Sequence, residues 1–587
     1  MHSSPDHDRP HHSLFQRGVW LSKAAVLTVP LLLAVALPVQ GSNAGATGTW
    51  GNAIEVPGTS TLNAGGDSAV LGESCSSSGN CAIIGYYLDG AQNYQAFVDD
   101  LVNGTWSPAQ EIPGFEALNA GGSVSTTMAI SCTGSGSCSA GGSYYDSSND
   151  PQAFVVTESN GTWGSAEEVP GFSSLNSAGA GSGLNALSCS SPGNCSAGGN
   201  YADVNGYVQA FITNEVNGTW TTAVEVPGTA SLNVNNNAAL TAMQCNANGA
   251  CSASGYYGTL QKQDGTFVVN ELQGTWQSAI ALPQSNLVSS SSSIDPGAIS
   301  CSSVGNCALV GSYQSAPNVS NPFVANEIGG TWQNATELQG VNQTGLSDAG
   351  LSAVSCSTNG NCSASGYVAQ SATAQQGIVA SEVNGTWGSA LPVPGLSTLD
   401  VANDEIAQAI SCVSPGNCTT GGFYSAATHV GHAYVADQVN GTWENAIELP
   451  GSATLDSGGD GSVFNVVCSA DDSCQVSGIY ADSSNNAQCL VDSSAAAFFV
   501  PEAPKIRAVS TIAKSITVSI LGTTQDGGSV ITGYQYALNG GAWVNVAVGT
   551  SFRIGKLSVA KSYRVQVRAV NAVGDGAASS TLSLKVK

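Results

Sequence analysis

A Trp follows a Gly-Thr pair every 55 to 57 residues along most of this chain. The eight tryptophans of the series are Trp50, Trp106, Trp163, Trp220, Trp276, Trp332, Trp387 and Trp443. A fixed period of this length is typical of stacked or radially arranged supersecondary units, because one such unit cannot bury its own apolar face. The sequence therefore predicts eight copies of one small unit between Trp50 and about Pro501.

The third unit divides into four strand-like segments. Residues 184–189 (LNALSC) form an apolar run, and residues 195–201 (CSAGGNY) follow after the turn-forming stretch SSPGN. Residues 208–216 (VQAFITNEV) alternate between apolar and polar, and residues 219–227 (TWTTAVEVP) end at a Pro-Gly pair. The Asn217-Gly218 pair between the last two segments indicates a type I′ hairpin, because both central residues of that turn need positive φ.

Four strands joined by tight turns, with a longer link to the next unit, describe a blade of a β-propeller. We therefore expect an eight-bladed β-propeller. Residues 50–57 (WGNAIEVP) form a fourth strand with no hairpin before it, so we expect this strand to complete the last blade or to pair beside it. An open β-solenoid is the competing architecture. It would need capping units, and only the eighth repeat, which ends in AAAFFVPEAP, is degraded.

Each unit also carries two cysteines separated by five residues. The pairs are Cys75/Cys81, Cys132/Cys138, Cys189/Cys195, Cys245/Cys251, Cys301/Cys307, Cys356/Cys362, Cys412/Cys418 and Cys468/Cys474. Metal ligation needs more ligands near one ion than one pair per blade supplies, and the Cys-x-x-Cys redox motif is absent. A hairpin brings the two cysteines within disulfide reach, so we predict eight intra-blade disulfides. Cys489 is left over, either as a buried strand thiol or as an intermolecular bridge.

The N-terminal 46 residues are typical of a secretory signal peptide. Basic residues precede the apolar run of residues 24–39, and Ala44 and Ala46 match a cleavage site. An uncleaved anchor is the alternative, but the run is short for a membrane span and contains two prolines. We therefore expect an extracellular protein that is free of the membrane after cleavage.

Charge is unevenly distributed along the chain. The net charge is −26 at pH 7, and Lys262 is the single basic residue between Ala24 and Pro504. A body this acidic repels phosphate backbones, which argues against a nucleic-acid partner.

Several residue types recur at fixed places in the units, and each admits two interpretations. The tyrosines six residues after the second cysteine either pack between blades or stack on sugars. The glutamates five residues after Trp line a solvated face. The Asn or Asp that follows Leu in the link between units either forms a turn or lines a ligand-binding ring near the propeller axis. The tyrosines are Tyr87, Tyr144, Tyr201, Tyr257, Tyr313, Tyr424 and Tyr480, with Val368 in the remaining unit. The glutamates are Glu55, Glu111, Glu168, Glu225, Glu337 and Glu448. The link residues are Asn63, Asn119, Asn176, Asn233, Asp400 and Asp456. We expect packing, solvation and turn formation, respectively.

No catalytic constellation stands out from the repeats. His429 and His432 are the only histidines after the signal segment, and we expect both at the surface rather than as a metal pair. Asp89, Asp146, Asp203 and Asp482 share one slot after the aromatic position and are typical of turn formers rather than paired catalytic carboxylates. We therefore predict no catalytic residue, no metal ligand and no cofactor.

The units, of the form SCxxxGNCSAGGxY…QAFVxxExNGTWxxAxEVPG, resemble secreted bacterial β-propeller repeats. They also resemble, more loosely, extracellular repeats named for a His-Ala-Phe core, which the QAF triplets and His432-Ala433-Tyr434 match. This resemblance implies an extracellular propeller and carries no known activity.

Residues 503–587 resemble a fibronectin type III domain. Leu557 and Tyr563 match the tyrosine corner of that family, and Asn571 and Gly574 match the end of its sixth strand. Ile520 stands where the family has a core Trp, and Trp543 is a candidate to compensate for it. The resemblance implies a β-sandwich, and such modules accompany extracellular polysaccharide-acting enzymes and surface proteins in bacteria.

The expected organisation is a signal peptide (1–46), a propeller (47–502) and a type III module (503–587). We expect a monomeric, non-catalytic secreted scaffold whose propeller loops bind a polysaccharide or a surface protein. An extracellular glycoside hydrolase or polysaccharide lyase is the alternative, and it would require unlike residues to converge at one mouth of the propeller.

Overall fold

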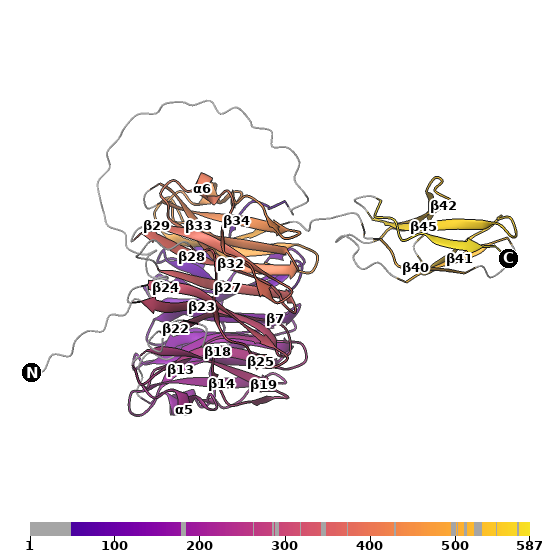
Figure 1. Cartoon of the computed structure of the whole chain (residues 1–587). Coiled ribbons are helices and arrows are strands. Elements are labelled where there is room, and N and C mark those ends of the chain that lie inside the picture. The colour runs from indigo at the N-terminus through magenta and orange to yellow at the C-terminus, as the bar shows by residue number, and fades with distance from the viewer. Residues whose placement is uncertain are drawn as a thin grey trace, which may run out of the picture.

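The computed structural model shows an all-β chain in which small antiparallel sheets recur (Figure 1). The predicted signal segment and His429 lie outside the described residues. No helix within the described ranges is long and apolar enough to cross a membrane. The described residues are 49–177, 183–261, 263–284, 287, 293–316, 319–341, 348–371, 374–427, 430–494, 501, 503–509, 514–521, 531–547, 549–571 and 575–586.

Each repeat folds into one antiparallel sheet, and the sheets are numbered first to eighth in chain order. The first strands are β2 (Ser68–Ser77), β7 (Val124–Gly134), β12 (Gly183–Ser191), β17 (Ala238–Cys245), β22 (Ile294–Ser303), β27 (Ala349–Thr358), β32 (Glu405–Ser414) and β37 (Ser462–Cys468). The second strands are β3 (Asn80–Leu88), β8 (Ser137–Tyr145), β13 (Asn194–Ala202), β18 (Cys251–Gly258), β23 (Asn306–Ala316), β28 (Asn361–Ser371), β33 (Asn417–Ala427) and β38 (Cys474–Ala481). The third strands are β4 (Tyr94–Val102), β9 (Pro151–Ser159), β14 (Val208–Val216), β19 (Asp264–Leu272), β24 (Val319–Ile328), β29 (Ala374–Val383), β34 (Val430–Val439) and β39 (Ala487–Ser493).

The predicted fourth strand is broken into two short strands in each of the first seven sheets. The first pieces are β5 (Thr105–Trp106), β10 (Thr162–Trp163), β15 (Thr219–Trp220), β20 (Thr275–Trp276), β25 (Thr331–Trp332), β30 (Thr386–Trp387) and β35 (Thr442–Trp443). The second pieces are β6 (Gln110–Glu111), β11 (Glu167–Glu168), β16 (Val224–Glu225), β21 (Ile280–Ala281), β26 (Thr336–Glu337), β31 (Leu391–Pro392) and β36 (Ile447–Glu448). The prediction of one continuous strand was wrong at this point.

A bond between neighbouring units explains the break. Both β15 and β16 pair with β14, but residues 221–223 between them face only residues 213–214 of that strand. The extra residue turns the Ala223 amide out of its own sheet, and its N–H donates to the carbonyl of Pro170 in the preceding unit at 2.8 Å. The same bond joins Ala53 to Pro450, Ala109 to Pro57, Ala166 to Pro113, Ala279 to Pro227, Ala335 to Pro283, Ala390 to Gln339 and Ala446 to Pro394. Each sheet is therefore tied through its backbone to the sheet before it.

The first and last units also meet. The N-terminal strand β1 (Ile54–Glu55) pairs with β39 and completes the eighth sheet, in the order β1-β39-β38-β37. The first strand of each sheet lies against the first strand of the next, and β2 of the first sheet lies against β37 of the eighth. Val70 and Phe97 of the first sheet share a buried cluster with Cys489 and Val491 of the eighth.

Glycine on the second strands allows the first strand to approach closely. A Cβ atom added to Gly199 would lie 1.9 Å from the carbonyl oxygen of Gly183, where the first strand carries a bulge. A glycine stands at this position, four residues after the second cysteine, in every unit. The Asn217-Gly218 turn has φ of 51° and 78°, which confirms the predicted hairpin geometry.

In the described part of the chain, six links between units contain a single helical turn that the sequence did not predict. Each turn follows a glycine with positive φ and ends at the recurring Asn or Asp. The turns are α2 (Thr59–Leu62), α3 (Phe115–Leu118), α4 (Phe172–Leu175), α5 (Thr229–Leu232), α6 (Leu396–Leu399) and α7 (Ser452–Leu455). They hold the link residue in one position in each of these units.

The C-terminal segment forms two further sheets, of order β40-β41-β44 and β43-β42-β45-β46. Their strands are β40 (Ile506–Val509), β41 (Ile516–Ile520), β42 (Gly533–Leu538), β43 (Val544–Val546), β44 (Ser551–Ile554), β45 (Ser562–Val570) and β46 (Leu582–Lys585). Val518 and Val567 are fully buried in the core between them.

Two predicted features of the C-terminal segment can be compared with the structure. The Tyr563 hydroxyl accepts a hydrogen bond from the Ser558 N–H at 3.0 Å, which is the bond expected of a tyrosine corner. Trp543 is not among the residues of the buried cluster that contains Ile520. The Arg568 guanidinium lies 4.4 Å from the centre of the Trp543 ring, and Ile520 is itself buried.

Candidate functional site

Each predicted cysteine pair forms a disulfide within its own sheet. Cys189 and Cys195 face each other across β12 and β13, with their Cα atoms 3.9 Å apart, and the other pairs repeat this arrangement. The eight disulfides are Cys75–Cys81, Cys132–Cys138, Cys189–Cys195, Cys245–Cys251, Cys301–Cys307, Cys356–Cys362, Cys412–Cys418 and Cys468–Cys474. Eight such bonds indicate an oxidising environment of the kind found outside the cytosol. Cys489 is free, fully buried in β39, and burial raises the pKa of its thiol to about 12.

The recurring tyrosines and glutamates bind one another. The Tyr313 hydroxyl donates to Glu337 at 2.8 Å, and Tyr87, Tyr424 and Tyr480 donate in the same way to Glu111, Glu448 and Glu55. The tyrosine rings are largely buried, as predicted. The glutamates were predicted to be solvated, and this was wrong in part, because each of these four carboxylates accepts a hydrogen bond from the tyrosine of its own sheet.

The recurring link residues join one sheet to the next rather than lining a ligand site. The Asn233 amide donates to the Val208 carbonyl and the Gln209 side chain of the third sheet, and its oxygen accepts from Asn237 and Gly258 of the fourth. The turn formation predicted for these residues is therefore accompanied by inter-sheet bonding. The Asn233 side chain is buried and its donors and acceptor are all used inside the protein, so it offers no free polar group to a ligand.

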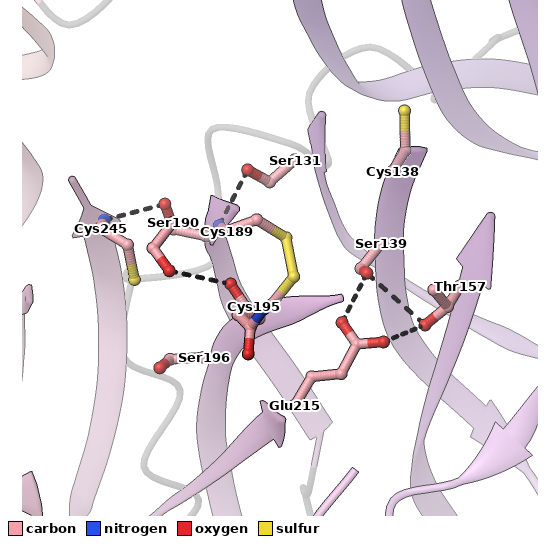
Figure 2. The surroundings of a disulfide bond; sticks show 12 residues. Ser131, Cys138, Ser139, Thr157, Cys189, Ser190, Cys195, Ser196, Glu215 and Cys245 are labelled. Carbon is pink, nitrogen blue, oxygen red and sulfur yellow. Dashed lines mark hydrogen bonds between the residues drawn. A yellow bond between two sulfur atoms is a disulfide. The ribbon is translucent and has the colours of Figure 1, made fainter. Parts of the chain in front are cut away.

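A second set of bonds crosses between the first strands. The N–H of Cys189 donates to the Ser131 hydroxyl of the preceding sheet at 3.0 Å (Figure 2). Six more junctions have this bond, to Ser74, Ser188, Gln244, Ser300, Ser355 and Ser411. At the junction between the eighth and first sheets the corresponding residue is Val467, whose side chain cannot accept a hydrogen bond.

A third set involves five of the tryptophans and the glutamate that stands five residues before each of these five, namely Glu158, Glu215, Glu271, Glu327 and Glu382. Glu215 of the third sheet accepts hydrogen bonds from Ser139 at 2.8 Å and Thr157 at 2.7 Å, both in the second sheet (Figure 2), and Trp220 Nε1 donates to the same Thr157 hydroxyl. Between later sheets, Glu271 accepts from Ser196 and Asn214, Glu327 from Asn270, and Glu382 from Asn326. In each case the preceding sheet supplies donors to a buried carboxylate. The sequence did not predict these bonds between sheets.

The pattern fails between the first and second sheets. Glu158 of the second sheet occupies the same position as Glu215. The first sheet, however, has Asp100 at the position of the donors Thr157 and Asn214, and Ala82 at the position of the donor Ser139. Glu158 is 3% exposed and its Oε2 atom has no hydrogen-bond partner among the described residues. Trp163 Nε1 donates to the Asp100 carboxylate at 3.1 Å.

These two carboxylates line a cavity of about 270 Å³ between the first and second sheets. Burial, and to a smaller extent the negative charge of Asp100, raise the pKa of Glu158 to about 7. Burial also raises the pKa of Asp100, and that of the adjacent Asp99 to about 8. Asp100 and Glu158 were not singled out from the sequence, although the missing serine and the Asp at this slot are visible when the units are aligned.

The junction of the eighth and first sheets holds another departure. Glu73 of β2 replaces an aliphatic residue or Met that stands two residues before the first cysteine in every other unit, for example Ile130 and Ile410. Glu73 is 9% exposed, and neither carboxylate oxygen has a hydrogen bond of normal geometry within the described ranges. Burial raises its pKa to about 8, offset in part by the Ser477 hydroxyl. Its oxygens lie near Cys75 and Cys81, but those sulfurs are joined in a disulfide and are not thiolate ligands.

The histidine and the turn aspartates have structural roles. His432 Nδ1 lies 3.3 Å from the buried Asp456 carboxylate, at the position where Gln209 meets Asn233 elsewhere, so His432 is less exposed than predicted. Asp89 accepts backbone N–H bonds from Ala91 and Asn93, which confirms the predicted turn role.

A larger cavity, of about 350 Å³, lies between the fifth and sixth sheets. The half-buried ring of Trp387 and the exposed side chains of Gln333, Glu337 and Gln339 line it. It combines an aromatic surface with amide and carboxylate groups at one place on the repeated body.

Comparisons with known proteins add fibronectin type III neighbours and little else. No protein-family model and no curated protein matches this chain. The FN5 domain of Drosophila Lar is 25% identical over 15% of this chain and 97% of its own length, with a TM-score of 0.13. The C. elegans twitchin kinase region is 22% identical over 15% of this chain, which spans only 17% of that structure, with a TM-score of 0.14. A Dyadobacter fermentans protein of unknown function is 12% identical over 52% of this chain and 93% of its own length, with a TM-score of 0.32. These scores carry no argument about function.

Proposed function

We propose that residues 47–502 form a closed eight-bladed β-propeller and that residues 503–587 form a fibronectin type III module. Two observations support closure: the Ala-to-Pro backbone bonds continue from the first sheet to Pro57 beside the eighth, and β1 completes the eighth sheet. In an open solenoid the first and last sheets would not contact each other, whereas here β2 of the first sheet lies against β37 of the eighth.

The proposed function is that of a secreted, monomeric, non-catalytic scaffold that binds an extracellular polysaccharide or surface protein. One observation carries this proposal: within the described residues, the polar side chains that recur in the units bind neighbouring strands or sheets, as Asn233 and Glu215 do. A body with a net charge of −26 over the whole chain is unsuited to nucleic acid.

The cavity beside Trp387 is the best-supported place for a polysaccharide. An aromatic ring offers a flat apolar face, and the surrounding amides and the Glu337 carboxylate can exchange hydrogen bonds with hydroxyl groups. The alternative, a glycoside hydrolase or lyase, has less support. Glu158, which lines a cavity together with Asp100, is 3% exposed and therefore too deeply buried for a polymer chain to reach.

A glycan array with the mature protein, run beside hydrolysis assays on the same polysaccharides, tests the proposal. We expect binding without turnover, and we expect Q333A/Q339A to weaken it because both side chains line the cavity. Gln277 occupies the position of Gln333 in the preceding unit, so Gln277→Ala is the matched control. Turnover that a single Asp or Glu substitution abolishes would favour the enzyme instead.

A further inference from the structure

We propose that the space between the first and second sheets binds a hard divalent cation, Ca²⁺ or Mg²⁺, through the carboxylates of Asp100 and Glu158. The proposal is independent of whether the protein is a scaffold or an enzyme. The junction between the first and second sheets lacks hydrogen-bond donors to the Glu158 carboxylate. Everywhere else that a buried glutamate occupies this place, the preceding sheet supplies a hydroxyl or amide hydrogen to it.

At this junction both sources of hydrogen bonds are replaced at once. The residue after the second cysteine is Ala82 rather than Ser, and the residue six before Trp is Asp100 rather than Thr or Asn. A second carboxylate in place of a donor puts two acceptors opposite each other. A positive charge between them satisfies both, whereas without one the buried Glu158 anion and the half-buried Asp100 anion repel each other and lose hydration.

The buried Glu158 carboxylate provides the second, independent observation. Glu158 lines the cavity and is only 3% exposed, and its Oε2 atom has no hydrogen-bond partner in the described part of the chain. Glu327 Oε2 at the equivalent position is also unpaired, but the other oxygen of Glu327 accepts from Asn270 of the preceding sheet. The first sheet supplies no such donor to Glu158, so the unpaired oxygen marks a place where an ion or a water can bind.

The cavity suits a hydrated hard cation in chemistry and in size. Carboxylate, amide and hydroxyl oxygens are the preferred ligands of Ca²⁺ and Mg²⁺, and Ser107, Asn80 and Asn160 also line this cavity. A volume of about 270 Å³ is several times the roughly 30 Å³ of one water, so an ion can retain part of its hydration shell. Thiolate ligands, which would favour Zn²⁺, are absent because the nearby Cys81 and Cys138 are in disulfides.

Trp163 supplies a spectroscopic probe of the site. Its indole N–H contacts Asp100, so a Tb³⁺ ion held by that carboxylate lies close to the ring and its luminescence is sensitised on excitation of the Trp. We expect the EDTA-treated mature protein in 150 mM NaCl to bind one Tb³⁺ with sensitised emission. We expect Ca²⁺ or Mg²⁺ to displace it, with a Kd of about 10⁻⁴ to 10⁻³ M by calorimetry.

Two variants distinguish this site from adsorption to the acidic surface. A82S/D100N restores the donor pattern of the sibling junctions, so it should fold, keep the melting temperature of the metal-free protein or raise it, and lose the Tb³⁺ signal. S139A/T157D copies the proposed site to the junction that contains Glu215, and should raise the stoichiometry to two.

Three results would overturn the proposal. They are the absence of Tb³⁺, Ca²⁺ and Mg²⁺ binding at millimolar concentration, unchanged binding by A82S/D100N, and unchanged stoichiometry in a folded S139A/T157D variant. In any of these cases, a proton shared between Asp100 and Glu158 would be the better explanation of the junction.

Discussion

Replacing Glu73 by the aliphatic residue that stands at this position in most other units should remove a pH dependence from the stability of the repeated sheets. In the unfolded chain this carboxyl ionises near pH 4.5, whereas in the folded protein burial holds its pKa at about 8. Between these values the folded state binds the proton and the unfolded state does not. The free energy of unfolding therefore falls as the pH rises through this window, by up to about 5 kcal/mol.

Glu73→Gln and Glu73→Ile test this with different strengths. The Gln variant keeps the shape of the side chain and removes the charge, so its unfolding free energy should be higher than that of the wild type at pH 8.5 and close to it at pH 4.5. The Ile variant should be more stable still, because it places an aliphatic group where the equivalent residues are Ile130 and Ile410. Exposed Glu116 provides the control, since Glu116→Gln should leave the slope unchanged.

Urea unfolding at pH 4.5, 6, 7 and 8.5, followed by Trp fluorescence, measures the effect. Asp99 and Glu405, whose pKa values burial raises to about 8 and about 7, contribute slopes of the same sign, so the informative quantity is the difference between wild type and variant. An E73Q protein with the wild-type slope would refute the claim that Glu73 is desolvated at this junction.

Three further predictions concern bonds within and between the sheets. Trp276→Phe removes an indole N–H that bonds to the preceding sheet, and should lower the free energy of unfolding by about 1–2 kcal/mol in urea titration. Val467→Ser should raise it by about 1 kcal/mol, because the new hydroxyl can accept from the Cys75 N–H as its siblings do; a loss of stability would contradict the role assigned to the serines. C189S/C195S opens a loop of sequence separation 6, and should cost about 2 kcal/mol without loss of the fold, as measured against wild type with and without reductant.

Features that depend on local geometry could be predicted from the sequence. The strands, the type I′ turn at Asn217-Gly218 and the Cys189–Cys195 pairing each need only residues close in the chain, and the structure shows all of them. The break in the fourth strand was not predictable in this way. Its cause is the bond from Ala223 to Pro170, which exists only once two units are packed together.

The candidate site was harder to foresee because it is defined by exceptions. A comparison of units shows which residues recur, and those residues turned out to bind their neighbours. Asp100 and Glu158 belong to different units and are 58 positions apart, so neither looks unusual within its own strand. The same holds for Glu73, whose isolation depends on the packing of the eighth sheet against the first.

Taken alone, the sequence determined the repeat, the strand order within a unit and the disulfide of each sheet, because a period of about 56 residues and short-range turn chemistry are written along the chain. Only the tertiary structure decided which carboxylates are solvated and which are enclosed without donors. Desolvation and hydrogen bonding depend on what the neighbouring sheet presents, and that neighbour is chosen by packing rather than by position in the sequence.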